Sequence, residues 1–91
     1  MTFDKDSAVA RAKRDLAERL NIDVGEVAEI VTEQEFPDMA LGAAEGGEMA
    51  AQMISSGWRI ELVTGDRMYE YRADKYQLRL YNFRGENYVV E

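Results

Sequence analysis

The segment from Gly57 to Phe83 constrains the fold of this chain more than any other. Apolar and polar residues alternate along it with a period of two, which is typical of strands with one buried face. Gly65-Asp66 and Asp74-Lys75 each fit a two-residue turn, and Gly adopts the positive φ of a primed turn without steric cost. The segment therefore predicts a meander of three antiparallel strands.

Both turns place the same apolar side chains on one face of the meander. The first turn sets Ile60 opposite Tyr71, and the second sets Tyr71 opposite Leu78. A slip of one residue would move every core side chain to the other face. The polar face then carries Arg59, Glu61, Glu70, Arg72, Gln77, Arg79 and Tyr81. In this register Glu61 faces Glu70 and Arg59 faces Arg72, which destabilises a sheet unless diagonal Glu–Arg contacts offset it. A first loop longer by two residues would instead pair Glu61 with Arg72.

Composition excludes several classes of function. The 91 residues suit one domain, 1–91, and the net charge is −7. Nucleic acid is therefore a poor partner, because phosphate binding needs clustered Lys and Arg. The chain has no Cys and no His, which removes disulfides, thiol catalysis, Cys/His zinc sites and the Ser-His-Asp triad. We expect no cofactor and no metal.

No segment approaches the length of about 20 apolar residues that spans a membrane, and the first residues lack the apolar core of a signal peptide. We therefore expect a soluble, acidic, cytoplasmic protein that does not bind membranes. The charged strands favour a monomer, whereas Val63 and Tyr81 on the outer face leave a weak homodimer open.

The first 21 residues predict a helix. Asp4, Asp6 or Ser7 is a suitable N-cap, and an apolar stripe recurs at helical spacing. That stripe consists of Val9, Ala12, Leu16 and Leu20. Together with the meander, the helix predicts an α+β fold in which an N-terminal helix packs on one face of a four- or five-stranded antiparallel sheet. Residues 88–90 are expected to add a short edge strand.

Residues 27–36 are rich in β-branched side chains and predict a further strand. Glu29, Glu33 and Glu35 share one of its faces. Carboxylates in a pair can bind a hard cation or transfer protons. However, carboxylates spaced by two along a half-exposed strand are usually its solvent face, and no calcium-loop motif accompanies them.

Phe36-Pro37-Asp38 ends that strand with the only proline of the chain. Residues 39–48 are rich in Gly and Ala and predict the most flexible segment, although their spacing does not match a phosphate-binding loop. Residues 49–55 favour a helix by propensity, but their short length and the Ser-Ser-Gly that follows also allow a strand.

Four motifs occur in an order and spacing that resemble a widespread group of small, mostly uncharacterised prokaryotic domains. That group has a Leu-Ala-x-Arg-Leu helix end, then Trp-Pro-Asp-x-x-Leu-Gly-Cys-Pro, Gly-Tyr-Arg-Ile-x-Leu and Tyr-Glu-Tyr-x-x-Asp. The matching residues are 16–20, Phe36-Pro37-Asp38 with Leu41-Gly42, 57–62 and 69–74. Phe36 replaces the Trp and Ala43-Ala44 replace Cys-Pro, so any role of that thiol is absent here. The resemblance implies a fold and a strand at residues 49–54, but no activity.

A second resemblance is to serine-protease inhibitors of the potato inhibitor I type. It rests on Phe36-Pro37-Asp38 and on Glu70-Tyr71-Arg72-Ala73-Asp74 with Leu78-Arg79-Leu80. In that family an Arg-bearing strand lies behind a long reactive loop. Here the segment before the Arg-bearing strand, residues 64–67, is too short to present a substrate-like loop.

These observations favour a non-enzymatic interaction module that binds a protein partner through the loop after residue 38. The candidate contact residues are Phe36, Pro37, Asp38, Met39, Leu41 and Met49, because methionine provides adaptable apolar contact. The same residues could instead only cap the core. A second interpretation is a small-ligand site between helix and sheet, lined by Trp58 or a tyrosine. An enzyme would depend on carboxylates such as Glu33, Glu35 and Asp38, and we do not expect one.

Overall fold

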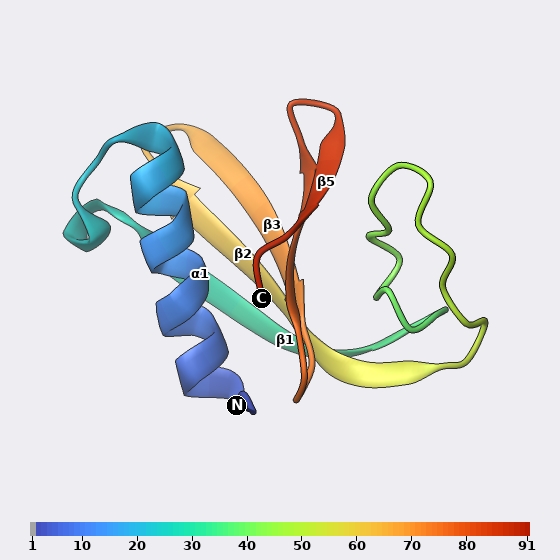
Figure 1. The fold of residues 1–91 in the computed structure, drawn as a ribbon. Coiled ribbons are helices and arrows are strands. Elements are labelled where there is room, and N and C mark those ends of the chain that lie inside the picture. Colours follow the sequence, from blue (N-terminus) through green and yellow to red (C-terminus); the bar gives the residue numbers. More distant parts are fainter. Residues whose placement is uncertain (1) are drawn as a thin grey trace.

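The structure is a computed structural model that describes residues 2–91. Helix α1 (Lys5–Leu20) is followed by the 3-10 turn η1 (Val24–Glu26) and then by five strands. The strands are β1 (Ala28–Phe36), β2 (Ser55–Thr64), β3 (Arg67–Ala73), β4 (Leu78–Phe83) and β5 (Glu86–Val89). They form one antiparallel sheet in the order β1-β2-β3-β4-β5. This confirms the predicted α+β fold, with α1 on one side of the sheet (Figure 1).

Helix α1 begins at a reciprocal cap. The Asp4 carboxylate accepts a hydrogen bond from the Ser7 amide over 2.8 Å, and the Ser7 hydroxyl accepts one from the Asp4 amide over 3.0 Å. Such a cap satisfies N–H groups that the helix itself leaves unpaired. The helix ends at Asn21, which adopts a left-handed conformation with φ 55°. Asp4 is therefore the cap among the three candidates.

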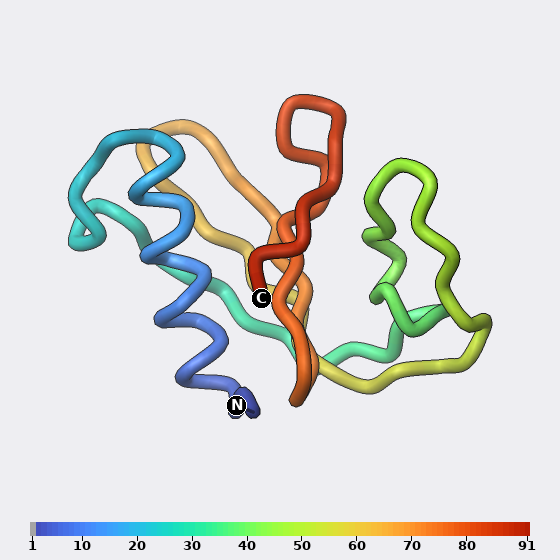
Figure 2. Tube along the Cα trace, in the orientation of Figure 1, coloured from blue at the N-terminus to red at the C-terminus, as the bar shows by residue number. Residues whose placement is uncertain are grey.

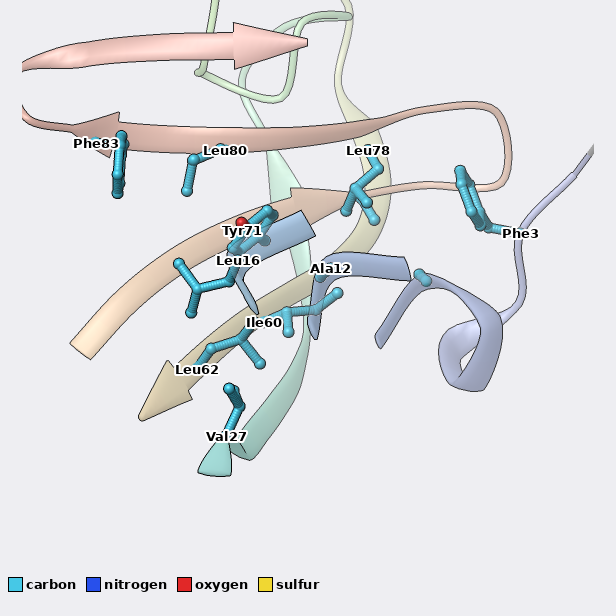
Figure 3. Close-up of a cluster of buried hydrophobic side chains, with 12 residues drawn as sticks. Phe3, Ala12, Leu16, Val27, Ile60, Leu62, Tyr71, Leu78, Leu80 and Phe83 are labelled. Carbon is cyan, nitrogen blue, oxygen red and sulfur yellow. The ribbon is translucent and has the colours of Figure 1, made fainter. Parts of the chain in front are cut away.

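The core lies between α1 and the inner face of the sheet (Figure 3). Leu16 of the helix packs in the same cluster as Ile60, Tyr71 and Leu80 from three consecutive strands, and all four are fully buried. Phe3 joins this cluster from the N-terminal segment, where its amide donates to the Lys75 carbonyl over 2.7 Å. The apolar face of the strands therefore packs against the apolar stripe of the helix, as predicted.

The register of the first hairpin is confirmed, because Thr64 faces Arg67 and Ile60 faces Tyr71. The prediction of a two-residue turn at Asp74-Lys75 is wrong. Residues 74–77 form a four-residue loop, so Tyr71 faces Leu80 instead of Leu78. The cause is Asp74, whose Oδ1 accepts hydrogen bonds from the amides of two later loop residues over 2.8 and 3.0 Å. A shift of two residues keeps each side chain on its predicted face.

Two predictions about short segments have different outcomes. The C-terminal strand exists, although it covers Glu86–Val89 instead of residues 88–90. The strand implied for residues 49–54 is wrong, because these residues have no regular secondary structure and β2 begins at Ser55. The ladder between β1 and β2 closes at Phe36 opposite Ser55. Pro37 follows directly, so the chain leaves the sheet there.

Candidate functional site

The connection between β1 and β2, residues 37–54, covers one end of the sheet face opposite to α1 (Figure 1). The trace in Figure 2 shows its two arms running back beside each other, and the amide of Met39 donates to the carbonyl of Ala51 over 2.9 Å. Ala40, Leu41 and Ala43 are almost completely buried. The connection is therefore a second layer on the sheet.

The turn after Pro37 is built by one carboxylate. Asp38 Oδ1 accepts hydrogen bonds from the amides of Ala40 and Gly42 over 2.9 and 3.0 Å. Within this turn, Leu41 and Gly42 take left-handed conformations, with φ 59° and 66°. A Cβ at Gly42 would lie 2.7 Å from Nη1 of Arg72. The Pro-Asp-x-x-Leu-Gly sequence therefore forms a tight turn that fits against an arginine of β3.

Two arginines on the outer face of the sheet bind the backbone of this connection. Nη1 of Arg72 donates to the Leu41 carbonyl over 3.0 Å, and its guanidinium lies 3.8 Å from the centre of the Tyr81 ring. Arg79 is almost completely buried, and its Nη1 donates to the Ala43 carbonyl over 3.3 Å. The two residues face each other across β3 and β4. The connection covers them, and Arg79 is buried whereas the Arg72 side chain keeps 15% of its surface exposed.

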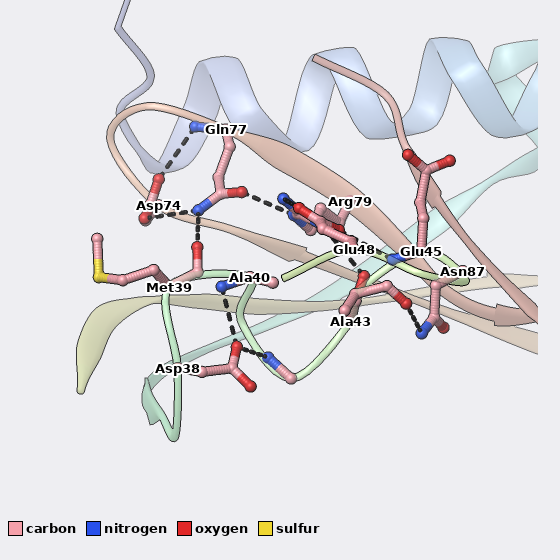
Figure 4. Close-up of polar contacts among 12 residues, drawn as sticks. Asp38, Met39, Ala40, Ala43, Glu45, Glu48, Asp74, Gln77, Arg79 and Asn87 are labelled. Atoms are coloured by element: carbon pink, nitrogen blue, oxygen red, sulfur yellow. Dashed lines mark hydrogen bonds and ion pairs between the residues drawn. The ribbon is translucent and has the colours of Figure 1, made fainter. Parts of the chain in front are cut away.

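Arg79 also forms a two-pronged ion pair with Glu48. The two Nη atoms reach the two carboxylate oxygens over 2.6 and 2.7 Å (Figure 4). Hydrogen bonds from Arg79 and from the Glu45 amide lower the pKa of Glu48 to about 2. Planar arginine and carboxylate groups suit this geometry. The ion pair therefore closes the far end of the connection onto the sheet.

Two side-chain amides complete the attachment. Gln77 Nε2 donates to the Met39 carbonyl over 2.7 Å, and Asn87 Nδ2 donates to the Ala44 carbonyl over 2.8 Å (Figure 4). Four backbone carbonyls between residues 39 and 44 thus accept hydrogen bonds from β3, β4, β5 and the β3–β4 loop. The segment that the sequence predicts to be flexible is held at defined points, because its donors come from distant parts of the chain.

The remainder of the connection is exposed and apolar. Residues 49–54, which we call the methionine segment, have no regular structure. The exposed fractions are 95% for Met49, 63% for Met53 and 71% for Ile54, and Met39 beside the segment is 42% exposed. Exposed apolar groups gathered on one element are typical of interaction surfaces.

The six predicted contact residues thus divide into two groups. Phe36 and Leu41 are fully buried, and Asp38 holds the turn that Pro37 begins. Met39 and Met49 are exposed. Sequence reasoning missed Met53 and Ile54, because a helix or a paired strand at residues 49–54 would have buried part of the segment. The one signal in the sequence was the apolar residues Met49, Met53 and Ile54 within the connection that follows Pro37.

The other polar groups that the sequence singles out are a buried tyrosine and the acidic stripe of β1. Tyr71 and Asp15 form a buried hydrogen bond between sheet and helix.

The acidic stripe of β1 lies on the same side of the sheet as α1, because Glu33 stands opposite Trp58 of β2. A groove of about 560 Å³ lies there, lined by Glu33, Gln34, Glu35, Ser56, Gly57 and Trp58. A ligand site between helix and sheet and protease inhibition both stay predictions, and the two-residue turn at Gly65-Asp66 leaves no long loop before β3.

Within residues 2–91, no group of three or more Asp, Glu, His or Cys side chains is placed to hold a metal ion. None of the helices in the same range combines the length and apolar character that crossing a bilayer requires.

A family model described as Domain of unknown function (DUF8738) matches residues 9–81. The chain belongs to the DUF8738 family. The DUF8738 match includes the turn after Pro37, both arginines and the methionine segment. No curated protein and no solved structure matches the chain.

Proposed function

We propose that this DUF8738 domain is a non-enzymatic binding module that contacts a protein partner through the methionine segment and Met39. The observation that carries the proposal is the exposure of Met49, Met53 and Ile54 on a connection that is otherwise fastened to the sheet. Methionine side chains are flexible and polarisable, so they adapt to apolar partner surfaces of different shapes.

The anchoring supports the same function. A loop that must become ordered on binding loses conformational entropy at that moment, which weakens the complex. Here Arg72, Arg79 and Gln77 hold the backbone that precedes the methionine segment. The segment therefore starts from a fixed base, while its side chains stay adaptable. Loops on a rigid scaffold are where binding residues are commonly found.

Site-specific crosslinking tests this proposal. A photoreactive amino acid replaces Met53 in one variant and Met68 in a matched control, because these methionines have similar exposed fractions of 63% and 57%. Met68 lies on β3, outside the connection. We expect one defined protein to crosslink to position 53 in living source cells, and not to position 68.

A third variant links the crosslink to the apolar surface. Replacing Met49 and Ile54 by Ser in the chain that carries the crosslinker at position 53 should abolish the product, while circular dichroism stays unchanged. Equal crosslinking at positions 53 and 68, or a product that survives the Ser substitutions, would contradict the proposal.

A further inference from the structure

Strand β1 is an open edge of the sheet. It pairs with β2 on one side through nine consecutive residues without a bulge, and it stands at the end of the strand order. Within residues 2–91 no strand pairs with its other side. An antiparallel edge strand presents alternating N–H and C=O groups to solvent, and these can pair with a further strand.

The protection of this edge is purely electrostatic. Edge strands commonly carry Lys, Pro or a bulge that blocks pairing with another chain. Strand β1 contains none of these, and Glu29, Glu33 and Glu35 are its only charged residues. Glu29 forms an ion pair with Lys13 of α1. Within the described chain, Glu33 and Glu35 have no ion-pair partner.

A second copy of this chain is a poor occupant. In an antiparallel pair of two β1 strands centred on Thr32, Glu29 of one copy would face Glu35 of the other. A shift of the centre to Glu33 would set the two Glu33 side chains opposite each other. Like charges directly opposite destabilise a sheet. The net charge of −7 adds to this repulsion, so the edge is complementary to a basic strand.

A groove beside the edge offers a place for a basic side chain. Glu33 and Trp58 are cross-strand neighbours, as are Glu35 and Ser56, so all four belong to the same face. They line the groove of about 560 Å³ together with Gln34 and Gly57. The two carboxylates and the indole therefore border the same groove. An aromatic ring with two carboxylates suits a Lys or Arg head group.

We propose that the open edge of β1 binds an extended basic segment of a protein partner by strand addition. The segment would pair with the backbone of β1 and place a Lys or Arg side chain in the groove between Glu33, Glu35 and Trp58. Backbone pairing gives affinity in this mode of recognition, and pockets for alternate side chains give specificity. The inference rests on an edge and charges that the methionine segment does not share, so either proposal can fail alone.

Peptide titration tests the inference. The probe is a nine-residue peptide in which Lys and Thr alternate, and its counterpart has Glu in place of every Lys. Trp58 is the only tryptophan, so its fluorescence reports the groove directly, and amide NMR shifts identify the strand that pairs. We expect the Lys peptide, and not the Glu peptide, to shift Trp58 emission and the amides of residues 28–36, with weaker binding at higher salt.

Charge variants decide whether the carboxylates direct this binding. Glu33→Gln with Glu35→Gln should weaken binding about fivefold, since an exposed ion pair contributes modestly. The control, Glu18→Gln with Asp66→Asn, removes two charges elsewhere and should leave affinity within about twofold. Glu33→Lys with Glu35→Lys should reverse the preference toward the Glu peptide. Equal binding by wild type and the Gln variant, amide shifts outside β1, or self-association through β1 in sedimentation would overturn the proposal.

Discussion

Tyr71 of β3 donates a hydrogen bond to Asp15 Oδ2 of α1 over 2.7 Å, and Arg19 Nε donates to the same oxygen over 2.7 Å. Tyr71 is fully buried and Asp15 is nearly so. The guanidinium of Arg19 also lies 4.7 Å from the centre of the Tyr88 ring. One carboxylate thus connects the helix to the centre of the sheet. Because this carboxylate is nearly buried, loss of either hydrogen bond would cost folding free energy.

Removing the Tyr71 hydroxyl should destabilise the fold. In Tyr71→Phe the Asp15 carboxylate keeps its bond from Arg19 but loses the other, so we expect a loss of about 1–2 kcal/mol in the free energy of unfolding. Tyr76→Phe is the matched control, because Tyr76 is 72% exposed, and it should change stability by less than about 0.5 kcal/mol. Urea denaturation measures both, and equal effects would contradict this role.

The same contact predicts an alkaline dependence of stability. Burial, and then the hydrogen bond to Asp15, raise the pKa of Tyr71 above its ordinary value of 10.0. The unfolded chain therefore loses this proton at lower pH than the folded one, so the contribution is complete below about pH 10 and is lost as pH rises further. The difference in unfolding free energy between wild type and Tyr71→Phe should shrink above pH 10. A constant difference would contradict the prediction.

Gly57 allows β2 and β3 to approach closely. A Cβ at this position would lie 2.0 Å from the Ala73 carbonyl oxygen, which is backbone and cannot move aside. Gly57→Ala should therefore cost more than about 3 kcal/mol or prevent folding. Gly46→Ala is the control, because nothing lies within 4 Å of its Cβ. Thermal melts should show a large fall in Tm for the first variant and little change for the second.

Acid should release the far end of the connection. The pKa of Glu48 falls from 4.5 to about 2 in the folded state, chiefly through Arg79. Its contribution is thus complete above about pH 4.5 and is lost as pH falls toward 2. NMR titration of the Glu48 carboxyl, with amide exchange at Ala43, follows this change. In Glu48→Gln the Ala43 amide should exchange faster with no step between pH 4.5 and 2, whereas Glu45→Gln should resemble wild type.

The sequence predicts the layers of this fold, because the period of two from Gly57 onward and the stripe around Leu16 each specify one buried face. The loop at Asp74 was not predicted, since its length depends on which amides the carboxylate binds. The anchoring of residues 39–44 depends on donors from other strands. No local pattern encodes such contacts, so the sequence indicated flexibility where the structure has attachment.

The methionine segment also shows this limit. Its propensities favoured a helix, and the resemblance implied a strand. Both depend on a neighbour that covers one face, and the ladder of β1 with β2 ends at Ser55. The exposure of Met53 and Ile54 follows from that missing neighbour and from no property of the residues themselves.

The most direct test of the methionine segment as a binding surface is NMR of ¹³C-methyl methionine in clarified source-cell lysate. Met39, Met49 and Met53 report the proposed surface, and Met68 on β3 is an internal control whose exposure is close to that of Met53. We predict that the signals of Met49 and Met53 broaden most, with a smaller effect at Met39, while Met68 stays sharp. Equal broadening of all four signals, or loss at Met68 alone, would contradict the proposed function.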